Sequence, residues 1–318
     1  MRYSQLVEPV RSAVVEAAAS EPGPGEVLIG VEACGVCASE LHTWMSGPAS
    51  SPRRLGHEPA GVVRALGPGA RRFRVGDRVT GLSSGAYSDT AIAREEFLLP
   101  IPDGVATEAA LGEPLACLVN GARRTRVELG DRVALIGLGF MGLGMLQLLK
   151  LRGAGYILAV DVREDARRRA LALGADEAVH PDEVADDFLL TEWKDWEGPC
   201  GVDVVVEATG TQAGLTLAGR MVRAHGVLSI LGFHQGVARE VDVEMWNWKA
   251  IDVVNAHVRR RADLMESMRM GLDLTAHGRL DLGALVTHRY TLEDVDRAYA
   301  DLRDKPEGFT KAVVYPGR

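Results

Sequence analysis

The sequence is poor in cysteine and has no long apolar run, and both absences narrow what the protein can be. No secretory signal precedes its four cysteines, so a disulfide framework is not expected. They are Cys34, Cys37, Cys117 and Cys200. The longest uncharged apolar stretch, between Arg132 and Lys150, is short for a membrane helix and is interrupted by four glycines. We therefore expect a cytoplasmic protein with no membrane partner.

Basic residues are also scarce relative to acidic ones. Thirty-six Lys and Arg stand against 44 Asp and Glu, which gives a net charge of -8 and a pI of about 5.6. A protein that binds nucleic acid usually presents a basic face, so nucleic acid is not expected as the main partner. The content of 47% hydrophobic and 25% charged residues is typical of a globular protein, and 318 residues favour two domains.

The first third of the chain predicts β-structure. Short β-branched runs lie between glycine and proline residues, a pattern typical of a barrel-like or sandwich-like unit. The runs are residues 26–36, 60–67, 77–82 and 87–93.

From about residue 115 the pattern alternates between strands and helices. Residues 131–137 form a continuous apolar run, which indicates a strand buried on both faces. Helices are expected over 140–153, 163–174 and 213–224, with strands at 156–161, 177–180, 202–207, 226–234 and 250–258. This alternation predicts a doubly wound parallel sheet, an α/β fold. After Arg259 we expect one long helix, strands near 285–291 and 311–316, and a short helix between them.

A glycine motif follows the first strand of the alternating region. "GLGFMG", from Gly137 to Gly142, fits the dinucleotide fingerprint, which needs a tight turn and a helix N-terminus facing the pyrophosphate. Asp161 stands nineteen residues later, where a carboxylate would bind the adenosine ribose hydroxyls. Such a carboxylate repels a 2′-phosphate and favours NAD over NADP, although Arg163 could accept that phosphate. The plain alternative is a packing turn beside a solvated aspartate.

Two short stretches carry groups that bind metals. "GVCASELH" contains Cys37, and "GHEP" contains His57 and Glu58. Cys37 and His57, with either Glu58 or Glu113 as the third ligand, would form a zinc site with one open position, as catalytic zinc sites have. Each residue alone would more often be structural.

These stretches, with "VGDRV", "EPLAC", "VDVVVEATG" and "FTKAVV", resemble the zinc-dependent medium-chain alcohol dehydrogenases over essentially the whole chain. The resemblance implies a GroES-like catalytic domain over 1–116 and 258–318, and a Rossmann cofactor domain over 117–257. It implies a cleft between them in which substrate and cofactor meet.

The resemblance also implies roles for individual residues. Cys37 and His57 match the first two zinc ligands. Glu58 matches a glutamate that is a ligand, or nearly one, in the polyol branch, and Glu113 falls where some relatives have a cysteine ligand and the polyol and glucose branches a glutamate. Which of the two glutamates is the third ligand stays open.

Further roles concern proton transfer and the cofactor. Ser39 matches the hydroxyl of the proton relay, His42 its solvent end, and Glu40 a carboxylate behind the metal ligands. Glu58 is also expected to act in catalysis. The expected cofactor residues are Gly137, Gly139, Phe140, Met141, Gly142, Asp161, Arg163, Thr209 and Lys311.

One departure from the family is informative. Many members carry a structural zinc on four cysteines, whereas this chain has no cysteine between Glu58 and Glu113. We therefore expect a single zinc ion per chain. Cys117 is interpreted as a small buried thiol and Cys34 as the end of a strand.

The expected activity is hydride transfer between a secondary alcohol and NAD, with a polyol, cyclitol or sugar-derived substrate. The alternatives are oxidation of a hydroxyethyl group on a bulkier intermediate, a zinc-free quinone or enoyl reductase, and a non-catalytic binding protein on the same fold. Trp44 is expected to line a pocket or to lie at the surface or an interface. The protein is expected to be a homo-oligomer, a dimer or tetramer.

Overall fold

The computed structural model describes residues 1–317, which divide into two compact units. The first comprises residues 1–116 and the residues from Arg260 onward, and the second comprises Cys117–Arg259. Helix α2 (Gly112–Arg124) contains the boundary near residue 116. No helix among the described residues is long and apolar enough to cross a bilayer.

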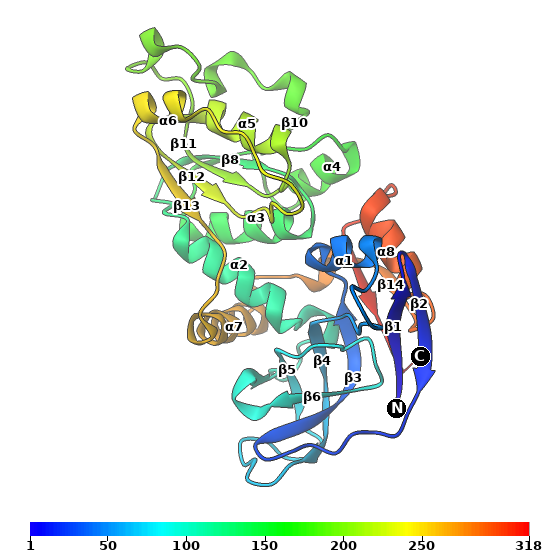
Figure 1. Ribbon diagram of the computed structural model, residues 1–318. Helices are drawn as coiled ribbons and strands as arrows, with labels where there is room; N and C mark the ends of the chain where they lie inside the picture. The colour runs from blue at the N-terminus through cyan, green and yellow to red at the C-terminus, as the bar shows by residue number, and fades with distance from the viewer. Residues whose placement is uncertain (318) are drawn as a thin grey trace. The chain divides into compact units, whose positions relative to one another are not determined.

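The second unit is built on a parallel sheet in the order β10-β9-β8-β11-β12-β13 (Figure 1). Its strands are β8 (Arg132–Ile136), β9 (Tyr156–Val160), β10 (Glu177–Val179), β11 (Val202–Glu207), β12 (Val222–Ile230) and β13 (Asp252–Asn255). All neighbours pair in parallel. The doubly wound α/β fold predicted from the alternating pattern is confirmed.

Four helices connect these strands: α3 (Phe140–Arg152), α4 (Glu164–Ala172), α5 (Gln212–Met221) and α6 (Val243–Lys249). The crossovers from β8 to β10 step in one direction along the sheet, and those from β11 to β13 step in the other. Right-handed crossovers of opposite direction put their helices on opposite faces. The direction changes between β8 and β11, and ligands of such sheets bind at the carboxyl ends of the strands there.

Helix α5 ends earlier than predicted. It stops at Met221, and the expected helical residues 222–224 begin strand β12 instead, with Val222 paired to Val202. The ammonium group of Lys249 donates to the carbonyls of Gly219, Arg220 and Val222 at 2.7, 3.2 and 2.9 Å. These carbonyls lack partners within the helix, so the lysine completes the helix end.

The first unit is β-rich, as predicted. Its main sheet has the order β14-β15-β3-β4-β5-β7, with β6 also paired to β3. The strands are β3 (Glu26–Gly35), β4 (Glu58–Leu66), β5 (Arg78–Gly81), β6 (Thr90–Arg94), β7 (Leu98–Pro100), β14 (Val286–Tyr290) and β15 (Lys311–Val314). A hairpin of β1 (Arg2–Glu8) and β2 (Arg11–Glu16) lies beside it.

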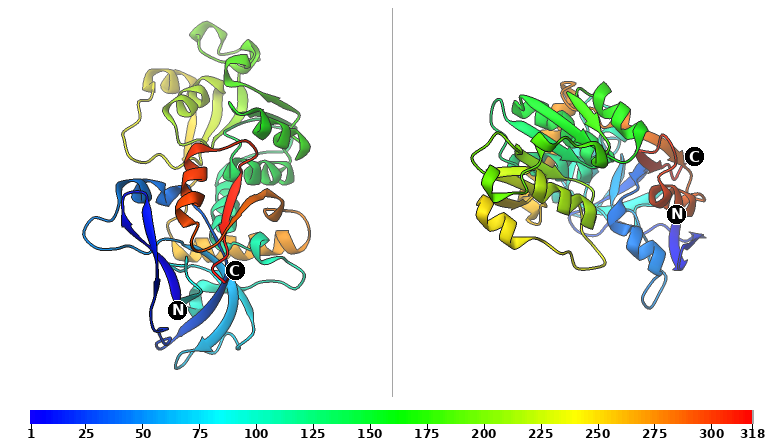
Figure 2. Two further views of the ribbon diagram at one scale, coloured as in Figure 1. Left: turned by 90° about the vertical axis from the view of Figure 1, so that its right-hand side faces the viewer. Right: turned by 90° about the horizontal axis from the view of Figure 1, so that it is seen from above.

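The C-terminal part of the chain completes this first unit. Helices α7 (Arg261–Ala276) and α8 (Val295–Asp304) belong to it, and β15 pairs with the end of β3 through Val313 and Gly35 (Figure 2, red). Helix α1 (Leu41–Ser46) follows the short helix η1 (Ala38–Glu40). The remaining short helices are η2 (Glu95–Phe97), η3 (Thr107–Ala109), η4 (Pro181–Glu183), η5 (Asp186–Phe188), η6 (Trp193–Asp195) and η7 (Gly283–Leu285).

Candidate functional site

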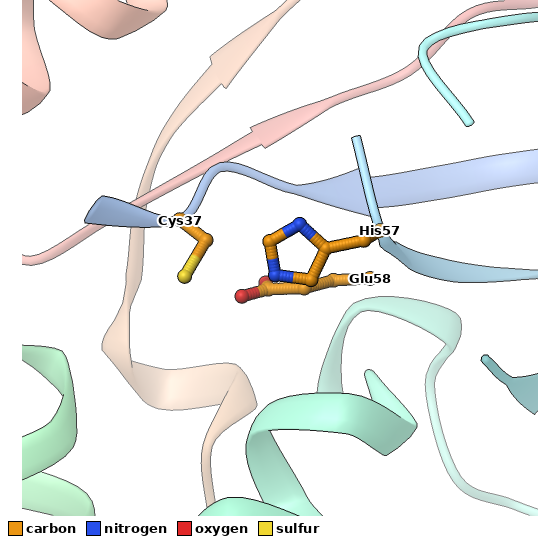
Figure 3. Close-up of side chains that lie close together, drawn as sticks. All are labelled: Cys37, His57 and Glu58. Atoms are coloured by element: carbon orange, nitrogen blue, oxygen red, sulfur yellow. The ribbon is translucent and has the colours of Figure 1, made fainter. Parts of the chain in front are cut away.

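Three side chains that can bind a metal converge in the first unit. The ligand atoms of Cys37, His57 and Glu58 all lie within 4.8 Å of one another, and Figure 3 shows the three groups pointing toward a common point. Cys37 stands just beyond the end of β3, while His57 and Glu58 stand at the start of β4. The two strands pair antiparallel with Gly35 opposite Glu58. A Cβ atom on Gly35 would lie 1.8 Å from the Glu58 carboxylate, so a glycine is needed there.

A buried lysine compensates the charge of Glu58. The Lys311 ammonium lies 2.5 Å from Oε2 of Glu58 and donates to the Val36 carbonyl at 3.0 Å. Burial alone would lower the pKa of Lys311, but the Glu58 carboxylate raises it above its usual value. Lys311, predicted to bind the cofactor, therefore makes its contacts with a predicted metal ligand, because β15 pairs with β3.

His57 is held from behind by Glu40. Its Nδ1 lies 3.2 Å from Oε1 of Glu40, which leaves Nε2 for a metal. Burial opposes a charged imidazole, but hydrogen bonds to Cys37 and Glu40 raise the pKa of His57 to about 12. A metal ion that binds here must displace that proton. Burial would raise the pKa of Glu40, but its contact with His57 lowers it.

Glu40 is anchored in turn by backbone and tyrosine groups. It accepts hydrogen bonds from the Gly56 amide at 3.0 Å and from the Tyr299 hydroxyl at 2.9 Å. The Tyr299 hydroxyl lies 3.2 Å from that of Tyr87, which donates to the Gly35 carbonyl. Sequence reasoning missed Tyr299, since it stands 259 residues from Glu40 and nothing in its local sequence marks it.

One of the two predicted relay residues, Ser39, contacts this cluster. The Ser39 hydroxyl donates to the Cys37 sulfur at 3.3 Å, and both Ser39 and His42 are exposed. Trp44, expected to line a pocket or to lie at a surface or interface, is instead 2% exposed in the core of the first unit. Its ring stacks on Tyr299 at 5.5 Å and its indole N–H donates to Asp296, so it fastens α1 to α8.

Glu113 lies outside the close group of ligand atoms. It begins α2, is half-buried, and is near enough to Lys311 for its charge to contribute to the raised pKa of that lysine. Of the two glutamates considered as the third ligand, Glu58 is therefore the one that the fold brings beside Cys37 and His57.

The three fingerprint glycines in the second unit serve three different needs. Gly137 has a φ of 96°, and a Cβ atom there would lie 2.7 Å from Thr209. A Cβ on Gly142 would lie 1.9 Å from the Gly137 carbonyl, so this glycine lets α3 pack on the turn. A Cβ on Gly139 would meet no protein atom within 4 Å. The open space over Gly139 at the N-terminus of α3 therefore fits a pyrophosphate.

Asp161 follows β9 beside this turn. Its Oδ2 accepts a hydrogen bond from the Leu138 amide at 2.7 Å, and its Oδ1 lies 3.4 Å from the Arg163 guanidinium. Asp161, expected to bind the ribose, is thus paired with Arg163, the residue that could bind a 2′-phosphate.

A second polar group that sequence reasoning missed lies near Thr209. Glu207, at the end of β11, is fully buried, and its carboxylate contacts the Thr209 and Gly210 amides and the ring of His234. Glu207 lies in the stretch "VDVVVEATG", but nothing in the sequence links it to His234, 27 residues away.

Comparisons with known proteins decide the family. Residues 23–103 match the alcohol dehydrogenase GroES-like domain, and residues 141–272 match the zinc-binding dehydrogenase domain. The sorbitol dehydrogenase of Halalkalibacterium halodurans is 31% identical over 319 residues, covering 90% of this chain and 91% of that protein. The chain belongs to the zinc-dependent alcohol dehydrogenase family.

Other members of this alcohol dehydrogenase family agree. The sorbitol dehydrogenase of Bacillus subtilis is 30% identical over 328 residues, covering 92% of this chain and 91% of that protein. Among solved structures, a zinc-binding dehydrogenase of Sinorhizobium meliloti 1021 with bound NADP superposes with a TM-score of 0.84 at 25% identity, covering 99% of both chains. The predicted family and its two kinds of domain are confirmed.

Proposed function

We propose that this alcohol dehydrogenase uses one zinc ion and NAD to oxidise the secondary hydroxyl of a polyol, cyclitol or sugar-derived alcohol. The observation that carries the proposal is the convergence of the half-buried Cys37 and His57 with the buried Glu58. Thiolate, imidazole and carboxylate are all zinc ligands, and three of them leave the fourth position open for substrate. A zinc-free reductase would not need this set.

Zinc supplies a Lewis acid that acidifies a coordinated hydroxyl, as it lowers the pKa of water from about 15.7 to about 7. Ser39, beside Cys37, is placed to take the hydroxyl proton, and the exposed His42 to pass it to solvent. Glu40 holds the His57 ring through Nδ1, which would leave Nε2 to bind the metal. Lys311 pairs with the Glu58 carboxylate at 2.5 Å.

The preference for NAD rests on Asp161. Its carboxylate is fixed by the Leu138 amide in the turn that would hold the pyrophosphate, where it repels a 2′-phosphate. Arg163 is paired with Asp161, so its guanidinium would bind a phosphate less strongly. Asp161→Ser should therefore shift kcat/KM toward NADP, and a wild type that prefers NADP would contradict this assignment.

The substrate class follows the relatives, since the two described above are sorbitol dehydrogenases. We also propose a homo-oligomer, a dimer or tetramer. Among residues 1–317, the last strand of the parallel sheet, β13, pairs on one side only and exposes Val253, which supports association of two copies. Sedimentation of the purified protein tests this.

The decisive experiment combines zinc analysis with a screen for NAD reduction across polyols, cyclitols, sugar alcohols and hydroxyethyl aromatics. The wild type should contain one zinc per chain and reduce NAD with a polyol-type substrate. Cys37→Ala should lose both zinc and turnover. Cys200→Ala is the matched control and should keep both, because Cys200 lies in the other unit.

The relay variants separate metal binding from proton transfer. Ser39→Ala and His42→Ala should keep zinc but slow alcohol oxidation, with Ser39→Ala the slower of the two, since general acid–base groups contribute about 10²- to 10⁴-fold. Glu113→Gln should keep its zinc if Glu58 is the third ligand. A zinc-loaded Cys37→Ala with full turnover would overturn the proposed function.

A further inference from the structure

A network of three polar side chains ties two loops together at the carboxyl edge of the parallel sheet. Glu207, His234 and Arg239 form this network, which we call the Glu207–His234–Arg239 network. It lies within the second unit, whereas the metal ligands belong to the first. Neither zinc binding nor the proton relay uses it.

The first member fixes the turn after β11. Oε1 of Glu207 accepts hydrogen bonds from the amides of Thr209 at 2.6 Å and Gly210 at 2.9 Å. That turn packs on the fingerprint, since Thr209 is the residue that a Cβ on Gly137 would strike. The carboxylate therefore shapes one wall of the proposed dinucleotide site.

The second member links this turn to the loop after β12. Nε2 of His234 lies 2.8 Å from Oε2 of Glu207, and Nδ1 of His234 accepts from Nε of Arg239 at 3.1 Å. A guanidinium only donates, so Nδ1 carries no hydrogen and Nε2 is the N–H group that donates to Glu207. The imidazole is thus a neutral bridge between a buried anion and a cation.

The third member closes the loop at a second point. Arg239 also donates to the Gly210 carbonyl at 3.0 Å, so the segment 233–239 is fastened to the β11 turn at both ends. The backbones come so close that a Cβ on Gly232 would lie 2.3 Å from the Gly210 amide nitrogen. Between its ends the segment is exposed, with Phe233 at 47% and Val237 at 72%. Besides the network, the ring of Phe233 packs near that of His257, with the ring centroids 5.6 Å apart.

The sheet order says what this segment would cover. The ribose carboxylate Asp161 follows β9, the pyrophosphate turn follows β8, and β11 and β12 continue on the other side. A dinucleotide that crosses the edge from β9 over β8 places its nicotinamide half near the ends of β11 and β12. We infer that His234 is a positioning residue that holds segment 233–239 over the nicotinamide half of the bound cofactor. This inference rests on the proposed function.

Binding of NADH, followed by its fluorescence in the purified full-length protein, tests the inference without any substrate. His234→Ala should weaken NADH binding by about 10- to 100-fold, the effect of losing a hydrogen bond to a buried charge. His234→Gln keeps one donor and one acceptor and should restore binding to within about threefold of wild type. His225→Asn is the control, because His225 is exposed on β12 and its φ of 56° suits asparagine. It should bind NADH as wild type does.

Steady-state kinetics add a readout that general loosening would not produce. In His234→Ala the KM for NAD should rise while kcat stays near that of wild type, since the chemical step does not involve the network. Arg239→Met, a change on the exposed segment, should also weaken NADH binding and decides the matter if His234→Ala does not fold. Tight NADH binding by His234→Ala or by Arg239→Met would overturn the inference.

The outcome separates this inference from the proposed function. If the glutamine variant restores NADH binding but no alcohol is oxidised, the positioning role stands and the proposed function fails. If alcohols are oxidised and all variants bind NADH equally, the proposed function stands and the positioning role is wrong. Equal loss of binding by His234→Ala and His234→Gln would also overturn it.

Discussion

Each of the two units buries one lysine, and the two ammonium groups have different hydrogen-bond partners. Lys311 in the first unit faces a carboxylate, Glu58, at 2.5 Å. Lys249 in the second unit faces the three carbonyls at the end of α5, and no carboxylate is found paired with it among residues 1–317. The carboxylate raises the pKa of Lys311, whereas burial lowers the pKa of Lys249 to about 8.

The two sites differ in the same way, since one consists of charged side chains and the other mainly of backbone. The site of the first unit consists of charged and polar side chains from segments far apart in the chain, including 37–42, 57–58 and 311. The site of the second unit consists mainly of backbone, opened by glycines that stand within six residues. We therefore expect the metal site of the first unit to be disrupted when a charged side chain loses its partner. The dinucleotide site of the second unit should be disrupted when a side chain fills the space above its glycines.

The largest effect should come from removing Lys311. Lys311→Met leaves Glu58 buried without a partner, which costs about 3–5 kcal/mol. Urea unfolding of metal-free protein should show this loss, and Lys311→Met combined with Glu58→Gln should recover most of it. If the single variant unfolds like wild type, the ion pair of Lys311 with Glu58 does not stabilise the fold.

Two alanine variants in the second unit should have different effects, one on the stability of the protein and the other on NADH binding. Gly142→Ala drives a methyl group against the Gly137 carbonyl and should destabilise the protein by about 2 kcal/mol. Gly139→Ala meets no protein atom, so the free energy of unfolding should stay unchanged while NADH affinity falls at least about tenfold. Unaltered NADH binding by Gly139→Ala would show that the space above it does not hold the pyrophosphate.

A smaller effect is expected behind the metal ligands. Tyr299→Phe removes the hydroxyl that holds Glu40, which in turn orients His57. Loss of such an outer hydrogen bond typically weakens metal binding, so zinc affinity should fall about tenfold. Competition with a chelator measures this, and the spectrum of the cobalt-substituted protein should change as His57 reorients. Tyr290→Phe is the matched control: that hydroxyl belongs to the same core but donates to Asp301. Equal zinc affinity in all three proteins would refute the link.

The smallest effect is a pH dependence due to Lys249. Its pKa is 10.5 when unfolded and about 8 when folded. Between these values the unfolded chain holds a proton that the folded protein has lost, so the free energy of unfolding rises with pH, by about 1 kcal/mol per unit. Lys249→Met should lack this rise. Urea unfolding of both proteins at pH 8 and pH 9.5 measures it, and parallel slopes would mean that Lys249 titrates normally.

The sequence predicted best what depends on neighbours in the chain. The fingerprint Gly137–Gly142 carries its own geometry, and the alternation of strands and helices sufficed for the parallel sheet. Cys37, His57 and Glu58 were found through two short motifs. The end of α5 was misplaced, because Lys249, 28 residues beyond Met221, completes it.

Residues that act from a distance could not be predicted. Tyr299 reaches Glu40 only because Trp44 fastens α1 to α8, and Lys311 reaches Glu58 only because β15 pairs with β3. Trp44 itself was expected near a surface or pocket, since its sequence neighbours do not reveal that Tyr299 covers it. Such contacts depend on tertiary pairing, which local patterns do not specify.

The position of Lys249 at the end of α5 predicts how this part of the protein responds to monovalent cations in the buffer. The Lys249 ammonium is held by three carbonyl oxygens, the type of ligand that replaces the hydration shell of a potassium ion in a selective channel. Lys249 can be regarded as a monovalent cation that is covalently attached to the chain and is therefore present at every ionic strength. The second unit keeps this cation without drawing it from solution, so replacing potassium by sodium in the buffer should leave this helix end unaffected.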